Sequence, residues 1–341
     1  MHPFARYLLN RTLVMVVTLF IAFNVSYFLL RAIPASAVDT MLNAIAQMGQ
    51  RLDPEEYMRM RQTLLELFGL TGSPLDQYLT YLRRFFTLDF GFSFIAFPRP
   101  AREIVARYLP WTVGLLLFTT FVSWVLGNIL GVVVSFARNR YISSLLENIA
   151  IVLYPIPYYV FSLALIYIFA YLIPVFSLSP ATMPSIKISS IPDLINVALY
   201  IMKAGAAPAF SIIVVSALGW WFISSRTLSL AIMTEDYVVY ARLRGIDMGR
   251  LRGKYVLRGI MVPQVTALAL ALGSIFSGAL VTEYIFAYPG LGSLLYQAII
   301  IGDYPVALTI LSLSMIGVTL ATWFLDAIVY YIVDPRIRFA R

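Results

Sequence analysis

The chain has 341 residues, of which 60% are hydrophobic and only 12% are charged, with a mean hydropathy of +0.83. Soluble domains carry about 25% charged residues, so this composition excludes an ordinary soluble domain and indicates an integral membrane protein. The net charge of +8 comes from Lys and Arg spread between apolar runs, which argues against a nucleic-acid partner. The absence of cysteine and a lone His2 exclude disulfides, thiolate chemistry and a buried histidine base or metal cluster.

The first apolar run, Thr12 to Leu30, carries no charge and is close to the ~20 residues that span a bilayer. Arg6 and Arg11 precede it and predict a cytoplasmic N-terminus, because Lys and Arg are retained on that side. Residues 35–37 (Ala-Ser-Ala) have the small-residue pattern of a signal-peptide cleavage site, but the run is longer than the ~7–15 residues of such a signal. We therefore favour an uncleaved first transmembrane helix, residues 1–31, over a cleaved signal peptide.

Residues 32–110 form the one sizeable polar region of the sequence, in which acidic and basic side chains balance. Because the chain crosses the membrane just before it, we expect this segment outside the cell. Asp53 as N-cap, Pro54 at the first position and the acidic pair 55–56 in the first turn predict a helix that ends at Gly69. Two roles stay open for the segment: a cap over the outer mouth, or a docking surface for an external protein.

The second apolar run, residues 111–137, begins with Trp111, as expected at the edge of a membrane, where interfacial aromatic residues lie. It contains Gly127 and Gly131, a Gly-x-x-x-Gly pair that permits close approach of another helix. Such pairs are frequent in membrane helices, so the pair is a weak signal.

The third apolar run, about 148–173, carries Pro155 and Pro157 near its start and predicts a kinked span. The kink has two open interpretations, a gating element and an irregularity of packing. The fourth run contains Trp220 and Trp221, which point to different sides of a helix because they are adjacent. We weigh a pathway-lining role for one of them against simple packing or lipid contact.

Two acidic residues lie in or near the last two apolar runs. Glu283 lies near the outer end of the fifth run, about 260–285, and Asp326 lies within the sixth, 305 to about 333. An ionisable group in the membrane costs about 2.5–3.5 kcal/mol on insertion scales, so each acid needs a reason to be there. A structural role and contact with a transported solute both stay open. Two distant acids do not form a proton relay, which argues against a proton-coupled carrier.

A polar, basic loop, residues 226–260, separates the fourth and fifth runs and should lie on the cytoplasmic side. Residues 236–244 contain good helix formers and stop at Gly245, and Asp247 offers an N-cap for a second helical piece. The pattern predicts two short helices joined by a glycine turn. We call this element the knob, and we expect it to be rigid enough for another protein to exert a force on it. Topology alone, or attraction to anionic lipids at about 1 kcal/mol per Lys or Arg, is the simpler alternative.

The segment from Gly249 to Tyr255 has almost the glycine spacing of a phosphate-binding loop. It has one residue too few between the glycines, Tyr255 stands where Ser or Thr would hold Mg²⁺, and no strand precedes it. We therefore expect no ATP binding by this chain. An intramembrane hydrolase is equally disfavoured, because no nucleophile–base pair is evident. The basic residues collect in segments expected inside, so an even number of spans, six, places both termini in the cytoplasm.

Several segments resemble the permease subunits of ABC transporters, most closely those of the dipeptide/oligopeptide family of binding-protein-dependent importers. In chain order they are Leu67-Phe68-Gly69-Leu70, Ser73-Pro74-Leu75, Leu88-Asp89-Phe90-Gly91-Phe92-Ser93, Glu235-Asp236-Tyr237-Val238 with Ala241-Arg242 and Gly245, Tyr288-Pro289-Gly290-Leu291-Gly292, and Asp334-Pro335-Arg336-Ile337-Arg338.

This resemblance implies an all-α integral membrane protein with six transmembrane helices and both termini cytoplasmic. The first helix (1–31) and an external polar segment (32–110) would precede a five-helix permease core (111–341) with a coupling loop at 226–260. The implied function is that of a non-enzymatic permease subunit, in the cell membrane, of an ATP-driven importer for peptides or related solutes such as oligosaccharides. The implied partners are a second homologous permease, two ATPase subunits that hold ATP and Mg, an external substrate-binding protein and the lipid bilayer.

The resemblance also assigns roles to residues, with no catalytic, cofactor or metal site among them. Coupling to the ATPases falls on Asp236, Tyr237, Tyr240, Ala241, Arg242 and Gly245. The arguments from the residues themselves, and not the resemblance, give the candidates for a pathway or gate: Trp220, Trp221, Glu283 and Asp326. A stand-alone channel or secondary carrier is the alternative. It would have no ATPase partner, and it would be expected to contain internal repeats, but no such repeats are visible in the sequence.

Overall fold

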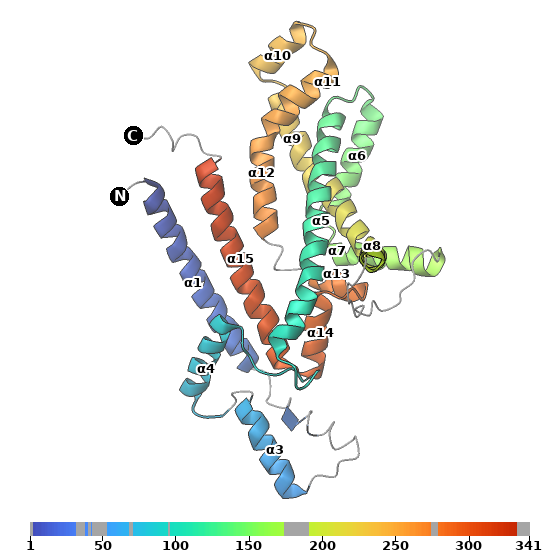
Figure 1. Ribbon diagram of the computed structural model, residues 1–341. Helices are drawn as coiled ribbons and strands as arrows, with labels where there is room; N and C mark the ends of the chain where they lie inside the picture. The colour runs from blue at the N-terminus through green and yellow to red at the C-terminus, as the bar shows by residue number, and fades with distance from the viewer. Residues whose placement is uncertain are drawn as a thin grey trace. The chain divides into compact units, whose positions relative to one another are not determined.

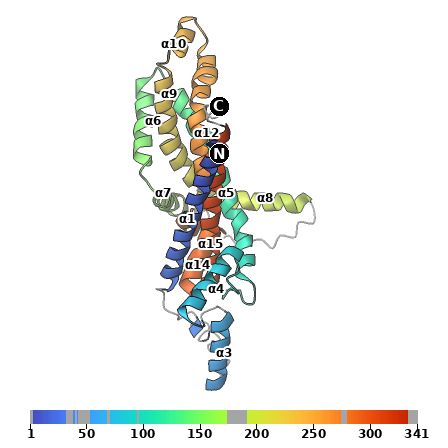
Figure 2. The same cartoon turned by 90° about the vertical axis from the view of Figure 1, so that its left-hand side faces the viewer.

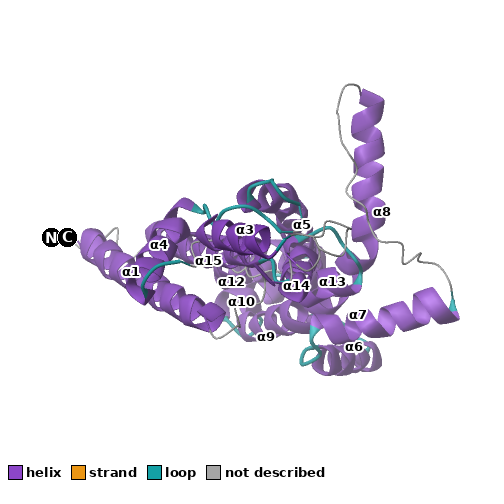
Figure 3. Ribbon diagram, turned by 90° about the horizontal axis from the view of Figure 1, so that it is seen from below, coloured by secondary structure: helices purple, strands orange, loops and turns teal. Residues whose placement is uncertain are grey.

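The computed structural model describes residues 3–31, 38–39, 42, 53–67, 71–94, 96–173, 191–273 and 279–332. Within these ranges the regular structure is helical (Figure 3), apart from one isolated bridge between Phe92 and Pro100. Among the described residues, five helical stretches are long and apolar enough to cross a membrane, or six if the bent pair α6 and α7 forms one span. The predicted all-α membrane fold is confirmed, and the cytoplasmic placement of the termini stays a prediction.

The helices are labelled in Figure 1. In chain order the elements are α1 (Pro3–Arg31), α3 (Pro54–Leu67), α4 (Pro74–Thr87), α5 (Ala101–Ser135), α6 (Arg140–Leu153), α7 (Tyr158–Ile166), the π-helix η1 (Tyr167–Leu172), α8 (Ile191–Ser216), the π-helix η2 (Ala217–Trp221), α9 (Phe222–Ile232), α10 (Asp236–Leu243), α11 (Met248–Arg250), the π-helix η3 (Leu251–Leu257), α12 (Arg258–Gly273), α13 (Leu280–Ile285), α14 (Leu291–Ile301) and α15 (Tyr304–Ile332).

The chain forms two compact units, and each is described by itself. The first unit comprises residues 1–112, 276–280 and 289–327, and the second comprises residues 113–275, 281–288 and 328–341. Helix α5 contributes its beginning to the first unit and its remainder to the second. The segments predicted from the sequence, 1–31, 32–110 and 111–341, are divided by where the chain crosses the membrane and do not correspond to these compact units. Their boundaries stay a prediction.

In the first unit, α14 and α15 pack against the start of α5. The hydroxyl of Thr112 accepts a hydrogen bond of 2.7 Å from the backbone N–H of Leu291, the first residue of α14. Helix α14 ends at Gly302, whose φ of +79° is the left-handed conformation that glycine adopts without strain. Their buried core consists of Ala101, Val105, Leu291, Leu294, Leu295, Ala298, Val306, Ala307 and Ile310.

In the second unit, α5 packs very closely on η2 and α9. A Cβ atom added at Gly127 would lie 2.3 Å from the Cβ of Trp221, and one at Gly131 would lie 2.7 Å from the Cβ of Ser225. Real Cβ contacts are longer than this, so only glycine permits the observed approach. The close helix packing predicted for the Gly-x-x-x-Gly pair is confirmed.

Three spans can be compared in outline with the sequence prediction. The predicted kink at Pro155 and Pro157 is confirmed as a sharp break, because α6 and α7 are bent by 104°. Helix α8 begins at Ile191, so the stretch that follows the third apolar run (about 148–173) is partly helical. The expected single fifth helix, about 260–285, is wrong because Ala279 lies outside helical structure: α12 ends at Gly273, and α13 begins at Leu280.

Candidate functional site

The basic loop folds into a knob at the ends of α9 and α12, where Figure 1 shows α10 and α11 together and Figure 2 shows α10 from the side. Helix α10 spans Asp236–Leu243, and the short helix α11 continues through η3 into α12. The predicted order of helix, glycine break and helix therefore matches the structure. The second helical piece runs past Pro263 without a break, further than the sequence suggested.

Backbone hydrogen bonds fix the turn of the knob. Gly245 has φ +72°, its N–H donates to the carbonyl of Arg242 at 3.0 Å, and the N–H of Ile246 donates to the carbonyl of Ala241 at 3.2 Å. This pair of bonds is the Schellman closure of a helix C-terminus. The carboxylate of Asp247 then accepts hydrogen bonds from the N–H groups of the next helix, 2.8 Å from Gly249 and 3.4 Å from Arg250. The turn therefore has one defined conformation.

The inner face of α10 anchors the knob to the second unit. Val238 and Ala241 are buried at 2% and 3% exposure. They pack in one core with Val132 of α5, Leu251 and Val256 of η3 and Ile260 of α12. Ala241 therefore supports α10 from beneath, and its side chain is not on the surface that a partner would meet. The other expected contact residues, Asp236, Tyr237, Tyr240, Arg242 and Gly245, are exposed.

The outer face of α10, defined here as Tyr237, Val239, Tyr240 and Leu243, is strongly exposed and mostly apolar. Leu243 is 80% exposed, and the guanidinium of Arg244 lies 5.4 Å from the centre of the Tyr240 ring. Val239 and Leu243 were not among the contact residues predicted from the sequence. Helical spacing would have found them, because positions 238 and 241 turn inward and positions 239 and 243 then turn outward.

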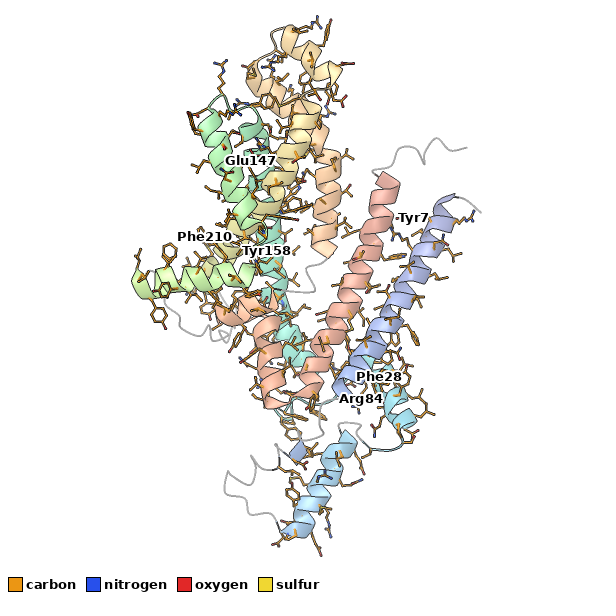
Figure 4. All side chains as sticks on the ribbon, turned by 180° about the vertical axis from the view of Figure 1, so that it is seen from behind. Tyr7, Phe28, Arg84, Glu147, Tyr158 and Phe210 are labelled. Atoms are coloured by element: carbon orange, nitrogen blue, oxygen red, sulfur yellow. The ribbon has the colours of Figure 1, made fainter. Side chains whose placement is uncertain are left out.

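A second structural link joins α9 and η2 to α6, and Figure 2 shows α6 and α9 side by side. Arg226 Nη1 donates to Glu147 Oε1 at 2.6 Å, and the pair is partly buried. Glu147 is labelled in Figure 4. Seven residues along α6, the ring of Tyr154 stacks on Trp220, with centroids 6.1 Å apart. Helix α6 is thus attached at two points. One is the ion pair, and the other is the ring stack, which lies next to the break between α6 and α7.

The candidate pathway residues lie on separate elements. Trp220 is 48% exposed, whereas Trp221 is buried against Gly127, so the prediction that they face different sides is confirmed. Glu283 is fully buried in α13, and its backbone carbonyl accepts a 2.8 Å hydrogen bond from Tyr288. Its side chain is therefore shielded from solvent by the chain itself. The side chain of Asp326 lies outside the described part of the chain.

A polar layer that the sequence analysis missed joins α5, α9 and α12. The indole N–H of Trp124 donates to the carbonyl of Gln264 at 3.1 Å, and the Gln264 amide donates to Ser224 at 2.9 Å. Ser225 donates to the carbonyl of Asn128 at 3.0 Å. Such bonds hold membrane helices together because the hydrocarbon offers no alternative partners. The sequence signal that could have revealed this layer is the presence of isolated Asn and Gln residues inside apolar runs.

Comparison with known proteins identifies the family. Residues 127–339 match the family described as "Binding-protein-dependent transport system inner membrane component". The oligopeptide transport system permease protein AppB of Bacillus subtilis is 27% identical over 335 residues, 98% of this chain and 100% of that protein. The dipeptide transport system permease protein DppB of Bacillus subtilis is 25% identical over 98% of both chains. The glutathione transport system permease protein GsiC of Escherichia coli K12 is 27% identical over 98% of this chain and 99% of its own length.

These permeases are similar to the present chain along nearly their whole length, and the matched region includes the knob, α9 and α12. The apolar helices of the present chain agree with the membrane location that the family description states. The chain therefore belongs to the family of inner membrane components of binding-protein-dependent transport systems, as a multi-pass permease subunit of the cell membrane.

Proposed function

We propose that this permease subunit forms part of the path by which an ATP-driven importer moves peptides, and that ATPase subunits act on it through the knob, residues 235–256. The similar permeases are named for oligopeptides, dipeptides and glutathione, which share peptide bonds, and these names support a peptide or related small solute as cargo. A second homologous permease, two ATPases that hold ATP and Mg, and an external substrate-binding protein complete the proposed assembly.

The outer face of α10 is the observation that carries the coupling role. Exposed large apolar side chains that cluster on a rigid element mark a protein contact surface. Tyrosine and arginine dominate the energetics of such contacts, and this face carries Tyr237 and Tyr240 beside Arg242 and Arg244. The buried inner face and the two caps give the surface a fixed shape, which lowers the entropy cost of docking.

The coupling route continues from the knob to the break between α6 and α7. A push on α10 is carried by its buried anchor into α9 and α12, because close-packed side chains transmit displacement. The ion pair of Arg226 with Glu147 and the stack of Trp220 on Tyr154 then carry the displacement of α9 to α6. The chain performs no covalent step in this scheme, and ATP is hydrolysed by the partner subunits.

Co-purification tests this proposal. Leu243→Asp places a charge at the most exposed side chain of the outer face of α10, whereas Met58→Asp places the same charge on exposed helix α3. Loss of a major contact residue costs about 2 kcal/mol or more, so recovery of the ATPases with Leu243→Asp should fall by more than about tenfold. Arg242→Ala should also weaken recovery, and Met58→Asp should not. Normal recovery with Leu243→Asp, from membranes that contain normal amounts of permease, contradicts the coupling role.

A further inference from the structure

Helix α4 is a short amphipathic helix in the segment between α1 and α5. Ser73 caps its N-terminus, and Asp76 completes a reciprocal capping box with it. The inner face contains Tyr78, Tyr81 and Phe85, of which Tyr81 and Phe85 are buried. The outer stripe, defined as Leu75, Leu79, Arg83 and Phe86, is exposed, with its three apolar side chains 66%, 52% and 67% accessible.

The inner face of α4 packs on α1, as Figure 1 shows, and Figure 4 labels Phe28 and Arg84 where the two helices lie together. The rings of Phe23 and Tyr81 stack with centroids 4.9 Å apart. The hydroxyl of Tyr78 donates to Asn24 Oδ1 at 3.0 Å, and the hydroxyls of Tyr81 and Ser26 lie 3.0 Å apart. The tyrosines of α4 therefore provide partners for polar side chains of α1.

These contacts lie inside the membrane-spanning part of α1. The charge-free stretch from Thr12 to Leu30, between Arg11 and Arg31, measures about 28 Å at 1.5 Å per residue, close to the ~30 Å of hydrocarbon in a bilayer. Phe23 and Asn24 precede Arg31 by seven to eight positions, or about 10–12 Å along the helix. A water-soluble protein does not reach this depth, whereas an interfacial helix buries its apolar face by about 5–10 Å.

The neighbouring surface of α1 also favours lipid as the occupant. Phe20, Ile21, Val25 and Phe28 of α1 are each more than half exposed, and in a membrane span such side chains face lipid. The outer stripe lies on the same short helix whose inner face packs on α1. Arg83 interrupts the stripe, and its long side chain can extend along apolar surface to a phosphate at the headgroup level.

We propose that α4 is a lipid-binding helix. Its outer stripe rests in the leaflet where α1 ends, with Leu75, Leu79 and Phe86 among acyl chains and Arg83 on a phospholipid phosphate. The segment between α1 and α5 is thereby anchored to the bilayer surface at α4. The inference stands apart from the coupling role proposed for the knob, and its test needs no ATPase.

The lack of cysteine in the chain allows single labels at chosen sites. Leu79→Cys and Phe86→Cys would carry a bimane fluorophore in full-length permease in nanodiscs, with Glu56→Cys on exposed helix α3 as the control. A lipid with a spin label high on its acyl chain should quench most of the emission at positions 79 and 86 and little at 56. Quenching of 79 and 86 by aqueous iodide alone shows a water-facing stripe and overturns the proposal. Protection from both quenchers shows a protein partner and also overturns it.

A second experiment addresses the phosphate contact. Thermal unfolding of the full-length permease is compared in nanodiscs of phosphatidylcholine with and without phosphatidylglycerol, for wild type, Arg83→Gln and the control Arg59→Gln on α3. The anionic lipid should raise the Tm of wild type and Arg59→Gln, and Arg83→Gln should lose much of that rise. A rise in Arg83→Gln equal to that of wild type contradicts the assignment of Arg83 to a lipid phosphate.

Discussion

Ser93 Oγ lies 2.5 Å from Asp303 Oδ2, although the two residues are 210 positions apart in the chain, and both are fully buried. The other carboxylate oxygen of Asp303 accepts a 3.3 Å hydrogen bond from the N–H of Val306 in the first turn of α15. The serine hydroxyl therefore donates to the residue that caps α15. This bond joins the loop before α5 to the start of α15, both in the first unit.

Replacement of Ser93 by alanine should destabilise the first unit, because a buried carboxylate loses a donor. Hydrogen bonds to charged groups contribute about 1.5–3 kcal/mol, so we expect a measurable fall in Tm of purified protein. Thr87→Ala is the control, since within the described part of the chain this exposed hydroxyl bonds to carbonyls of its own helix, 3.0 Å from that of Arg83. Equal Tm values for the two variants would show that the Ser93–Asp303 bond contributes nothing.

Two glycines of α5 should respond differently to the same change. Gly127→Ala forces a Cβ to within 2.3 Å of Trp221, whereas Gly114→Ala meets no atom of the described residues within 4 Å. Overpacking costs about 1–3 kcal/mol, so Gly127→Ala should lower the Tm and Gly114→Ala should leave it unchanged or higher. Thermal unfolding followed by circular dichroism makes the comparison. The account of this helix contact is wrong if Gly127→Ala unfolds at the wild-type temperature.

The knob contains a similar pair of glycines for comparison. Both Gly245 and Gly253 have open space for a Cβ, but only Gly245 has a positive φ, of +72°. Alanine in the left-handed region costs about 1–2 kcal/mol, whereas alanine in a helix is favoured over glycine. Gly245→Ala should therefore distort the turn and reduce ATP-dependent uptake by the assembled transporter, while Gly253→Ala should preserve it. Full uptake by Gly245→Ala would show that the turn need not keep this conformation.

Acid should weaken the cap of α4. Asp76 Oδ2 accepts hydrogen bonds from the hydroxyl and the N–H of Ser73, at 2.6 and 3.1 Å, which lower the pKa of Asp76 from its ordinary value. Because the folded-state pKa is the lower one, the stabilisation is complete above the ordinary pKa of about 4 and is lost as pH falls through the folded value. Asp76→Asn should therefore lower the Tm at pH 7, and the difference from wild type should shrink toward pH 3. A difference that stays constant down to pH 3 would exclude the ionised carboxylate as its cause.

Much of the fold follows from local sequence signals. Asp53 and Pro54 announce α3, which begins at Pro54 and ends at Leu67. Gly245 and Asp247 correctly predict the end of one helix and the start of the next, because both act through their own backbone neighbourhood. The membrane class can also be predicted from local sequence, because it follows from the length of the apolar runs and from their lack of charge.

Features that depend on distant residues could not be found in this way. Ala241 belongs to a buried core with Val132, which lies more than a hundred positions earlier, so the sequence alone assigned it to the contact surface. The partnership of Arg226 with Glu147 and that of Ser93 with Asp303 depend on how helices pack, which local patterns do not specify. The interruption between α12 and α13 was missed because the run is apolar throughout, and hydropathy does not distinguish one helix from two.

The central claim is that the permease moves solute only when ATPases act on its knob. The direct measurement is uptake of radiolabelled peptide, chosen as the ligand of the binding protein that co-purifies, into liposomes that contain the assembled transporter. We predict uptake with ATP, none without it, and a loss of more than about tenfold when Leu243→Asp disrupts the outer face of α10. Uptake by this chain alone, in the absence of nucleotide, would contradict the account.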